Sequence, residues 1–237
     1  MPVEANLTGS EKWEFDAEVA DAFDDMLSRS IPGYAAMRQL CFNLGSRFVA
    51  PKTDIVDLGC SRGGALSDFV RKFGALNRYY GCDVSDPMLA AARERFSGYI
   101  SAGVVDVRRC DLREDYPPAQ ASLTLCVLTL QFTPIEHRLK IVQAMHDHSL
   151  AGGAVLLVEK VLGRTAASDA TLVGAYLDHK RREGYTEDEI RRKKLSLEGV
   201  LVPCTARWHE DMLADVGFRH VERFWQHLNF CGWFAVR

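Results

Sequence analysis

The sequence lacks any excess of positive charge, because 29 Lys and Arg residues stand against 32 Asp and Glu residues, for a net charge of −3. This balance disfavours tight, sequence-independent binding to a phosphate backbone, although a local basic patch leaves contact with nucleic acid open. No apolar run approaches the ~20 residues that span a bilayer, so no contact with a membrane is expected. Residues 1–15 contain neither an apolar run nor a small-residue cleavage site, which predicts that no signal peptide is present.

The sequence also lacks the paired cysteine spacings of a zinc site or a redox-active motif. Its cysteines are scattered and are predicted to be reduced and mostly buried, at Cys41, Cys60, Cys82, Cys110, Cys126, Cys204 and Cys231. The seven histidines are equally dispersed, so no metal site is predicted and no catalytic base is assigned. Together with the missing export signal, these features predict a cytoplasmic protein.

The length of 237 residues predicts one domain, residues 1–237, with helical additions. Residues 16–29 carry apolar side chains on one helical face, and a second helix is expected around 34–48, so residues 1–50 form a helical N-terminal lid. Residues 166–200 form a second helical segment, which is rich in Lys and Arg. Both segments carry apolar faces that one sheet cannot cover, which predicts a homodimer.

Between these segments, apolar runs alternate with helical patterns of about 10–15 residues, which favours a mostly parallel sheet covered on both faces. Strands are expected at residues 53–60, 78–83, 103–110, 122–128 and 154–160. Helices are expected at residues 64–73, 87–96, 134–150 and 205–216. The last two apolar runs, residues 218–225 and 228–236, are close enough to form an antiparallel hairpin. The fold class is therefore α/β, Rossmann-like and doubly wound.

A glycine-containing turn follows the first strand, in the run V-D-L-G-C-S-R-G-G at residues 56–64. Glycine lets the backbone turn tightly and lets a ligand approach the peptide groups. Asp83 ends the second strand, where a carboxylate can accept both hydroxyls of an adenosine ribose. After the third strand, Asp111 and the neighbouring backbone amide can meet the adenine. The spacing breaks the dinucleotide pattern G-x-G-x-x-G, so S-adenosylmethionine is favoured over a nicotinamide cofactor.

The D-L-G-C-S-R-G-G turn, the acid after the second strand, the C-D-L turn and the terminal hairpin resemble the class I S-adenosylmethionine-dependent methyltransferases. The resemblance covers residues 50–237 and implies a seven-stranded sheet whose last strand is antiparallel. It implies that the chain is an enzyme that transfers the cofactor's methyl group to a small molecule. The candidate cofactor-binding residues are Tyr34, Asp57, Gly59, Cys60, Ser61, Asp83, Val84, Asp111, Leu112 and Val127.

Shorter stretches along nearly the whole chain resemble the carboxy-S-adenosylmethionine synthase family. They include W-x-F-D from Trp13, R-S-I-P-G-Y ending at Tyr34, T-L-Q-F at 129–132, E-G-Y at 183–185 and L-E at 197–198. The family joins a prephenate-derived carboxylate to the methyl carbon of the cofactor, for modification of wobble uridine in tRNA. The resemblance implies that Tyr34 reaches the cofactor and that an arginine of the basic segment holds the carboxylate.

The sequence departs from that family at two positions. The register places Lys194 at the carboxylate-binding arginine, and lysine is a mobile point charge without the planar fork of arginine. Val127 stands where the family has asparagine. Arg191 or Arg192 could substitute for the arginine, while Arg191, Arg192 and Lys193 together are typical of a solvated helix face. Lys194 and Tyr176 are the candidate substrate-binding residues, although core packing is the commoner role for a tyrosine like Tyr176.

Three functions are therefore open. The first is methyl transfer to an acceptor that the sequence does not identify. The second is synthesis of carboxy-S-adenosylmethionine from prephenate, and the third is binding of S-adenosylmethionine without turnover. Methyl transfer demands little of the side chains, because the sulfonium is already activated and the protein must mainly align the acceptor and exclude water.

Overall fold

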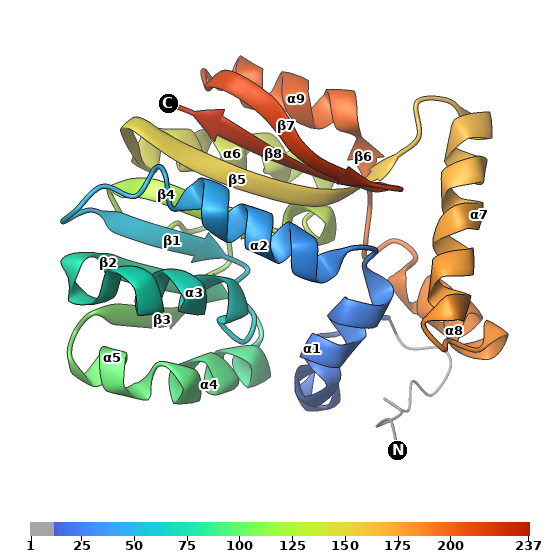
Figure 1. Ribbon diagram of the computed structural model, residues 1–237, viewed down its shortest axis with the longest axis horizontal. Helices are drawn as coiled ribbons and strands as arrows, with labels where there is room; N and C mark the ends of the chain where they lie inside the picture. The colour runs from blue at the N-terminus through green and yellow to red at the C-terminus, as the bar shows by residue number, and fades with distance from the viewer. Residues whose placement is uncertain (1–11) are drawn as a thin grey trace.

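The computed structural model describes residues 12–237, so the part of the signal-peptide prediction that falls on residues 1–11 lies outside the described residues. One sheet forms the centre, with the strand order β3-β2-β1-β4-β5-β8-β7 and the short β6 paired to β5 (Figure 1). The strands are β1 (Asp54–Leu58), β2 (Arg78–Asp83), β3 (Val105–Arg109), β4 (Ala121–Val127), β5 (Ser149–Leu162), β6 (Cys204–Thr205), β7 (Arg219–His227) and β8 (Phe230–Val236). Strands β1 to β5 pair in parallel, whereas β8 is antiparallel to both of its neighbours. The mostly parallel sheet with an antiparallel last strand is confirmed.

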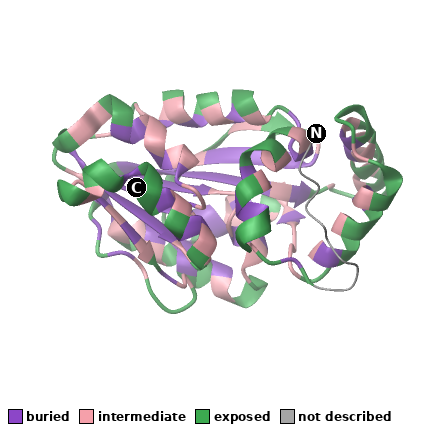
Figure 2. Ribbon diagram, turned by 90° about the horizontal axis from the view of Figure 1, so that it is seen from below, coloured by how far each residue is buried: buried purple, intermediate pink, exposed green. Residues whose placement is uncertain are grey.

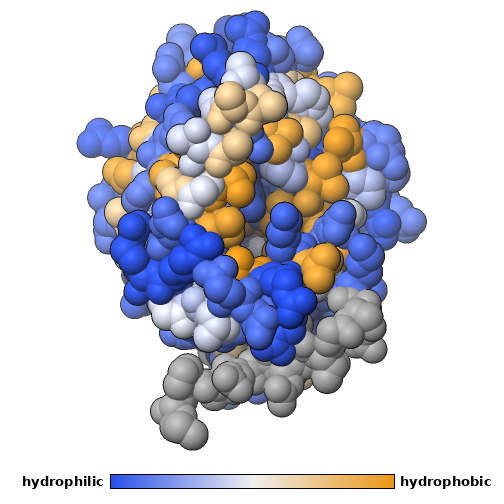
Figure 3. Space-filling view, turned by 90° about the vertical axis from the view of Figure 1, so that its right-hand side faces the viewer, coloured by the Kyte–Doolittle hydropathy of each residue, from blue (hydrophilic) through white to orange (hydrophobic). Residues whose placement is uncertain are grey.

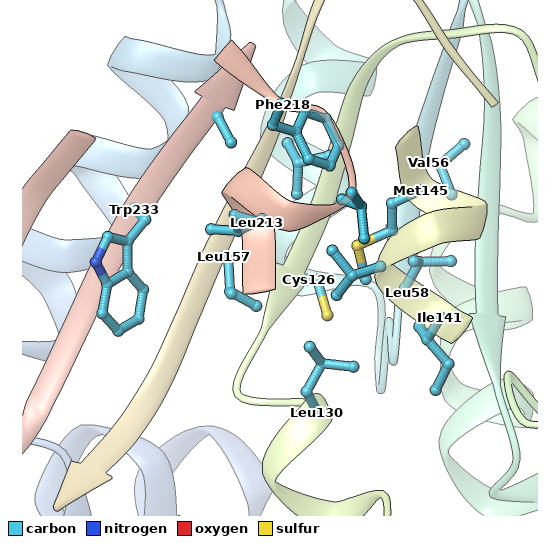
Figure 4. Close-up of a cluster of buried hydrophobic side chains, with 14 of the residues drawn as sticks. Val56, Leu58, Cys126, Leu130, Ile141, Met145, Leu157, Leu213, Phe218 and Trp233 are labelled. Atoms are coloured by element: carbon cyan, nitrogen blue, oxygen red, sulfur yellow. The ribbon is translucent and has the colours of Figure 1, made fainter. Parts of the chain in front are cut away.

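Helices cover both faces of this sheet. Helices α2, α3 and α4 pack on one face, where Phe69 of α3 shares a hydrophobic cluster with Leu125 of β4. Helices α6 and α9 pack on the other face, where Ile141 and Leu213 join a cluster with Leu58 (Figure 4). These elements are α2 (Tyr34–Gly45), α3 (Gly64–Phe73), η1 (Gly74–Leu76), α4 (Asp86–Arg95), α5 (Ser97–Ser101), η2 (Leu130–Phe132), α6 (Ile135–His148) and α9 (Ala206–Asp215).

Burial on both faces explains the composition of the central strands. The run from Ala154 to Val158 in β5 is buried at every position, as expected of a strand between two helical layers. Figure 2 shows buried residues along the strands and exposed residues on the outer faces of the helices. The doubly wound α/β class predicted from the sequence is thus confirmed.

Three further helices lie beyond the carboxyl ends of the parallel strands: α1 (Ala17–Ser30), α7 (Ala166–Arg182) and α8 (Glu187–Leu197) (Figure 1). Each begins at a residue whose side chain accepts a backbone N–H of the first turn, namely Asp16, Thr165 and Thr186. The segment before α1 is tied to the end of α8, because Trp13 N donates to Ser196 O at 3.0 Å. The helical segments predicted at residues 1–50 and 166–200 therefore meet beyond the carboxyl ends of the parallel strands, through α1 and α8.

The predicted boundaries differ from the structure mainly around β5. The sequence predicts a helix to residue 150 and a strand from 154, but α6 ends at His148 and β5 already begins at Ser149. Glycine makes this early start possible, because a Cβ on Gly153 would lie 2.9 Å from the carbonyl oxygen of Ala121 on β4. The two-residue β6 was not predicted and brings the sheet to eight strands.

All seven cysteines are buried and unpaired, as predicted. Among residues 12–237, no helix is long and apolar enough to cross a lipid bilayer.

Candidate functional site

A cavity of about 930 Å³ opens at the carboxyl ends of β1 to β4. The loops after these strands form one side of it, and residues of α1, α7 and α8 form the opposite side. Figure 3 looks onto the face over which α7 and α8 lie and shows hydrophobic side chains gathered around a recess. In an open α/β sheet, ligands bind outside the carboxyl ends of the strands, so this cavity is the candidate site.

Every candidate site residue from the sequence lies on the wall of this one cavity. They are Tyr34, Asp57, Gly59, Cys60, Ser61, Asp83, Val84, Asp111, Leu112, Val127, Tyr176 and Lys194. Arg191 and Arg192 are not on the wall; both are exposed, and Arg191 pairs with Asp188 at 2.8 Å. The structure therefore offers neither arginine as a substitute for the family's carboxylate-binding residue.

The turn after β1 requires glycine. Gly59 has a φ of +70°, and a Cβ at this position would lie 2.3 Å from Oγ1 of Thr129. The amides of Gly59 and Cys60 both donate to the carbonyl oxygen of Cys82, at 2.8 and 2.9 Å, which fastens the turn to the end of β2. The turn therefore presents bare backbone to the cavity, as the sequence predicted.

Asp83 connects the glycine turn to the next helix. One carboxylate oxygen accepts from Ser61 N and the other from Ser85 N, each at 2.9 Å. Ser85 in turn caps the N-terminus of α4 by accepting from Met88 N at 3.3 Å. Burial raises the pKa of Asp83, while these N–H groups work in the opposite direction. Each oxygen retains a lone pair for a ligand hydroxyl, so the geometry suits the predicted contact with a ribose.

Asp57 is a second buried carboxylate on the wall. It lies in β1, two residues before Gly59, and its Oδ2 atom has no hydrogen-bond partner among the described residues. Burial, opposed by Arg38 and reinforced by Asp83, raises the pKa of Asp57 to about 7. An unsatisfied buried carboxylate oxygen suits a cationic ligand group, such as the ammonium of a methionine moiety. Tyr34 lines the cavity close by, at the first position of α2.

Cofactor affinity is therefore expected to depend on pH. Below a pH of about 7 Asp57 is protonated and neutral, so its attraction for the ammonium group is lost, by up to about tenfold in affinity per pH unit. Titration calorimetry with S-adenosylhomocysteine between about pH 6 and 8 should show affinity rising with pH. Asp57→Asn should flatten that profile, whereas Asp54→Asn, at the far end of the same strand, should not. A wild-type profile as flat as that of Asp57→Asn would contradict this assignment.

Asp111 and Val127 lie on the cavity wall beside these groups. Both oxygens of Asp111 accept from Arg113 Nε, at 2.9 and 3.0 Å, and this guanidinium lowers the pKa of Asp111 to about 2. This partner was not predicted, although a spacing of two residues between opposite charges is a usable signal in the sequence. Val127 ends β4 and adds an apolar surface where the resembling family has an amide.

The structure corrects the interpretation of Lys193. The sequence favoured a solvated face for it, but its Nζ donates to Ser30 Oγ at 3.0 Å and lies 5.2 Å from the ring centre of Trp13. It therefore faces the cavity, together with Lys160 and Lys180, neither of which was predicted to be a site residue. The spacing of Ile190, Lys193 and Leu197 on one helical face is the signal that could have indicated it.

Tyr176 lies between a hydrophobic cluster and the cavity. Its ring packs against Phe230 with centroids 5.6 Å apart, so it belongs to a small hydrophobic cluster. The same ring lies 4.8 Å from Lys160 Nζ and 5.0 Å from Lys180 Nζ. In the described structure its aromatic face thus meets lysines of the protein.

Comparison with known proteins places these features in context. A family model described as a methyltransferase domain matches residues 55–153. The chain is 39% identical over 224 residues to the carboxy-S-adenosyl-L-methionine synthase of Methylococcus capsulatus, covering 94% of this chain and 93% of that protein. The corresponding protein of Wolinella succinogenes is 39% identical over 229 residues, covering 95% and 94%.

Solved structures share the fold at low sequence identity. Human N-acetylserotonin methyltransferase in complex with SAM is 13% identical, with a TM-score of 0.61 over 93% of this chain and 55% of that one. Phosphoethanolamine N-methyltransferase 2 of Haemonchus contortus, also in complex with S-adenosyl-L-methionine, is 16% identical, with a TM-score of 0.66 over 94% and 57%. At such identities the similarity establishes the fold alone.

Proposed function

This chain belongs to the carboxy-S-adenosyl-L-methionine synthase family within the S-adenosylmethionine-dependent methyltransferase superfamily, and we propose that it makes carboxy-S-adenosylmethionine. The carboxylate donor would be prephenate. In a balanced reaction the bond between the prephenate ring and its carboxyl carbon breaks, and that carbon bonds to the methyl carbon of the cofactor. The ring hydroxyl and one methyl proton leave together as water, and phenylpyruvate is the second product.

One observation carries this proposal over simple methyl transfer. The side of the cavity opposite the glycine turn is built from α1, α7 and α8, which lie outside the matched methyltransferase domain, residues 55–153. Similarity to the synthases extends over 94% of the chain and therefore includes α7 and α8. The second substrate would meet the part of the chain that these relatives share.

Lys194 supplies a positive charge on that side. It lines the cavity and is exposed, and among residues 12–237 no carboxylate lies within ion-pair distance of it. An ammonium without an internal partner is available to a carboxylate on the bound cofactor. We therefore propose that Lys194 replaces the arginine of the relatives with a single-point contact.

Incubation with labelled S-adenosylmethionine and prephenate, followed by mass spectrometry of the small molecules, tests the proposal. A cofactor that has gained one carboxyl group supports it. Accumulation of S-adenosylhomocysteine with an added acceptor would instead establish methyl transfer. Methyl transfer is the second candidate function because Val127 and Lys194 replace the asparagine and the arginine of the synthase family. Binding of the cofactor with neither product would indicate a non-catalytic role.

The contribution of Lys194 is expected to be specific for the carboxylated cofactor. Lys194→Ala should weaken binding of carboxy-S-adenosylmethionine by roughly tenfold or more, because a hydrogen bond to a charged group contributes about 1.5–3 kcal/mol, and should leave S-adenosylmethionine unaffected. Lys194→Arg should bind at least as tightly as the wild type. Arg191→Ala, one turn away on the exposed face, is the matched control. Equal affinities of Lys194→Ala and wild type for the carboxylated compound would refute this role.

We also propose that the protein is a cytoplasmic homodimer. Its unpaired cysteines suit a reducing compartment. The two helical segments whose apolar faces predict the dimer expose Leu40 and Leu195, which have exposed fractions of 40% and 57%. Light scattering that gives the mass of a single chain at micromolar concentration would exclude the dimer.

A further inference from the structure

Three lysines converge on the cavity from three separate elements. Lys160 lies near the end of β5, Lys180 in the last turn of α7 and Lys193 in the last turns of α8. Lys180 is only 5% exposed, and Lys160 and Lys193 are half-buried. Lysine is among the residues that are least often buried, so three of them on one cavity wall require an explanation.

Two tyrosine rings hold the three ammonium groups near one another. Tyr176 lies between Lys160 and Lys180, with Nζ-to-centroid distances of 4.8 and 5.0 Å. Tyr185 lies between Lys180 and Lys193, with distances of 5.5 and 5.7 Å. The Tyr185 hydroxyl is 2.9 Å from Ser30 Oγ, which also accepts from Lys193 Nζ. Cation–π contacts of this kind orient an ammonium group but leave its charge uncompensated.

No carboxylate among residues 12–237 forms an ion pair with these three lysines. In the described part of the chain every ion pair is made by an arginine or a histidine, and none by a lysine. Acids near these lysines in the sequence have other partners: Glu159 accepts from the backbone of residues 129–131, Asp178 pairs with Arg181, and Glu189 accepts from Thr186 N. Asp169 accepts from Gly163 N and only partly offsets the effect of burial on the pKa of Lys160, which stays lowered. The carboxylates of Asp57 and Asp83 lie on the strand side of the same cavity.

The lowered pKa values of these lysines show that the protein environment disfavours their charged forms. Burial, together with the nearby charges of Lys180, Arg29 and Lys160, lowers the pKa of Lys193 to about 7. Burial and Lys160 likewise lower the pKa of Lys180 to about 8. Uncompensated buried charges destabilise a fold, and an anion that binds among them removes that penalty. The cluster is thus a preorganised anion site, as expected where function opposes stability.

We propose that Lys160, Lys180 and Lys193 bind the second substrate, a small organic dicarboxylate, and hold it opposite the cofactor. This inference rests on the proposed function and adds the residues that select the co-substrate. Three cations favour an anion of at least two charges. The ring of Tyr176, together with Ile31, Ile190 and Phe230 on the same wall, favours an organic body over inorganic phosphate. Lys194 remains free for the carboxylate on the cofactor.

The test measures binding to the full chain saturated with S-adenosylhomocysteine, using prephenate as the dicarboxylate probe and phenylpyruvate as the monocarboxylate. Lys180→Met and Lys193→Met should each weaken prephenate binding about tenfold or more and affect phenylpyruvate less. Affinity for S-adenosylhomocysteine should stay unchanged. Lys72→Met is the matched control, because Lys72 also lies over aromatic rings, 5.2 Å from both Phe42 and Phe73, but outside this cavity.

A stability measurement separates a binding role from a structural one. Without ligand, Lys180→Met and Lys193→Met should melt at a higher temperature than the wild type, because they remove buried charge. The same concentration of prephenate should raise the melting temperature of the wild type more than that of either variant. Lower melting temperatures together with unchanged prephenate affinity would overturn the proposal.

The two proposals can fail separately. Lysine-dependent prephenate binding without a carboxylated product would refute the proposed function and leave this inference standing. Normal formation of the carboxylated cofactor by Lys193→Met and Lys180→Met, with wild-type prephenate affinity, would refute this inference and leave the proposed function standing.

Discussion

Replacing Asp83 by alanine is expected to abolish measurable binding of S-adenosylmethionine. The carboxylate ends β2 at the floor of the cavity and already accepts from Ser61 N and Ser85 N, each at 2.9 Å. Two ribose hydroxyls would lose a charged acceptor, and each such hydrogen bond contributes about 1.5–3 kcal/mol, so affinity should fall at least ~100-fold. Isothermal titration calorimetry measures this directly, and wild-type affinity in Asp83→Ala would exclude the ribose-binding role.

Loss of binding could also follow from collapse of the glycine turn, because Ser61 N loses its acceptor. A double-mutant cycle with a cofactor analogue that lacks the 2′-hydroxyl separates the two causes. If Asp83 contacts the ribose, the wild type loses affinity for the analogue, whereas Asp83→Ala binds cofactor and analogue equally. Asp86→Ala is the control. Asp86 lies three residues after Asp83, and its exposed carboxylate pairs with Arg109 at 3.3 Å.

The fold was predictable because its main signals are local. The predicted strand at residues 78–83 has the same bounds as β2 in the structure. For the other long elements, the predicted and observed ends differ by a few residues. Period-2 and period-3.6 patterns survive in a single sequence, whereas β6 has only two residues and leaves no period. The start of β5 depends on how closely Gly153 approaches the backbone of β4, which is a contact between distant segments.

The residues of the candidate site also fall into those that local signals predict and those that depend on contacts between distant segments. The residues that follow β1, β2 and β3 were found because the carboxyl ends of parallel strands meet at one edge, whatever the loops contain. The direction of Lys193 was not found, because it depends on Ser30, 163 residues away, and on Trp13. Such distant partners decide which face of a charged helix turns inward, and the run of four cations does not show it by itself; only the spacing of Lys193 from the apolar Ile190 and Leu197 gives an indication.

Glu159 provides the second large expected effect, on stability. Its side chain is fully buried in β5 and accepts three backbone N–H groups, from Thr129 at 3.1 Å, Leu130 at 2.9 Å and Gln131 at 2.8 Å. These are donors at the start of the η2 turn, where a short helix leaves N–H groups without internal partners. Glu159→Ala would leave all three N–H groups without an acceptor, and each unsatisfied buried donor costs about 1–3 kcal/mol of folding free energy.

The expected result is a melting temperature lower by roughly 10 °C or more, since 1 kcal/mol corresponds to about 2–4 °C in a protein of this size. Thermal denaturation followed by circular dichroism measures it, with the exposed Glu136→Ala as control. Glu159→Gln should fall between wild type and Glu159→Ala, because its amide keeps one accepting oxygen and turns a donor toward an N–H group. A melting temperature of Glu159→Ala within 2 °C of the wild type, about 1 kcal/mol or less, would show that the turn does not depend on this carboxylate.

The same substitution should reach the cofactor site through one intermediate residue. Thr129 Oγ1 donates to the carbonyl oxygen of Leu58 at 2.9 Å, and its side chain fills the space that a Cβ on Gly59 would need. Releasing Thr129 N from Glu159 therefore loosens the packing against the glycine turn, so Glu159→Ala that remains folded at low temperature should also bind S-adenosylhomocysteine more weakly. Glu159 would then act as a positioning residue: weaker binding should accompany the loss of stability, and Glu159→Gln should restore part of both. Unchanged affinity in a destabilised Glu159→Ala protein would confine this carboxylate to the stability of the fold.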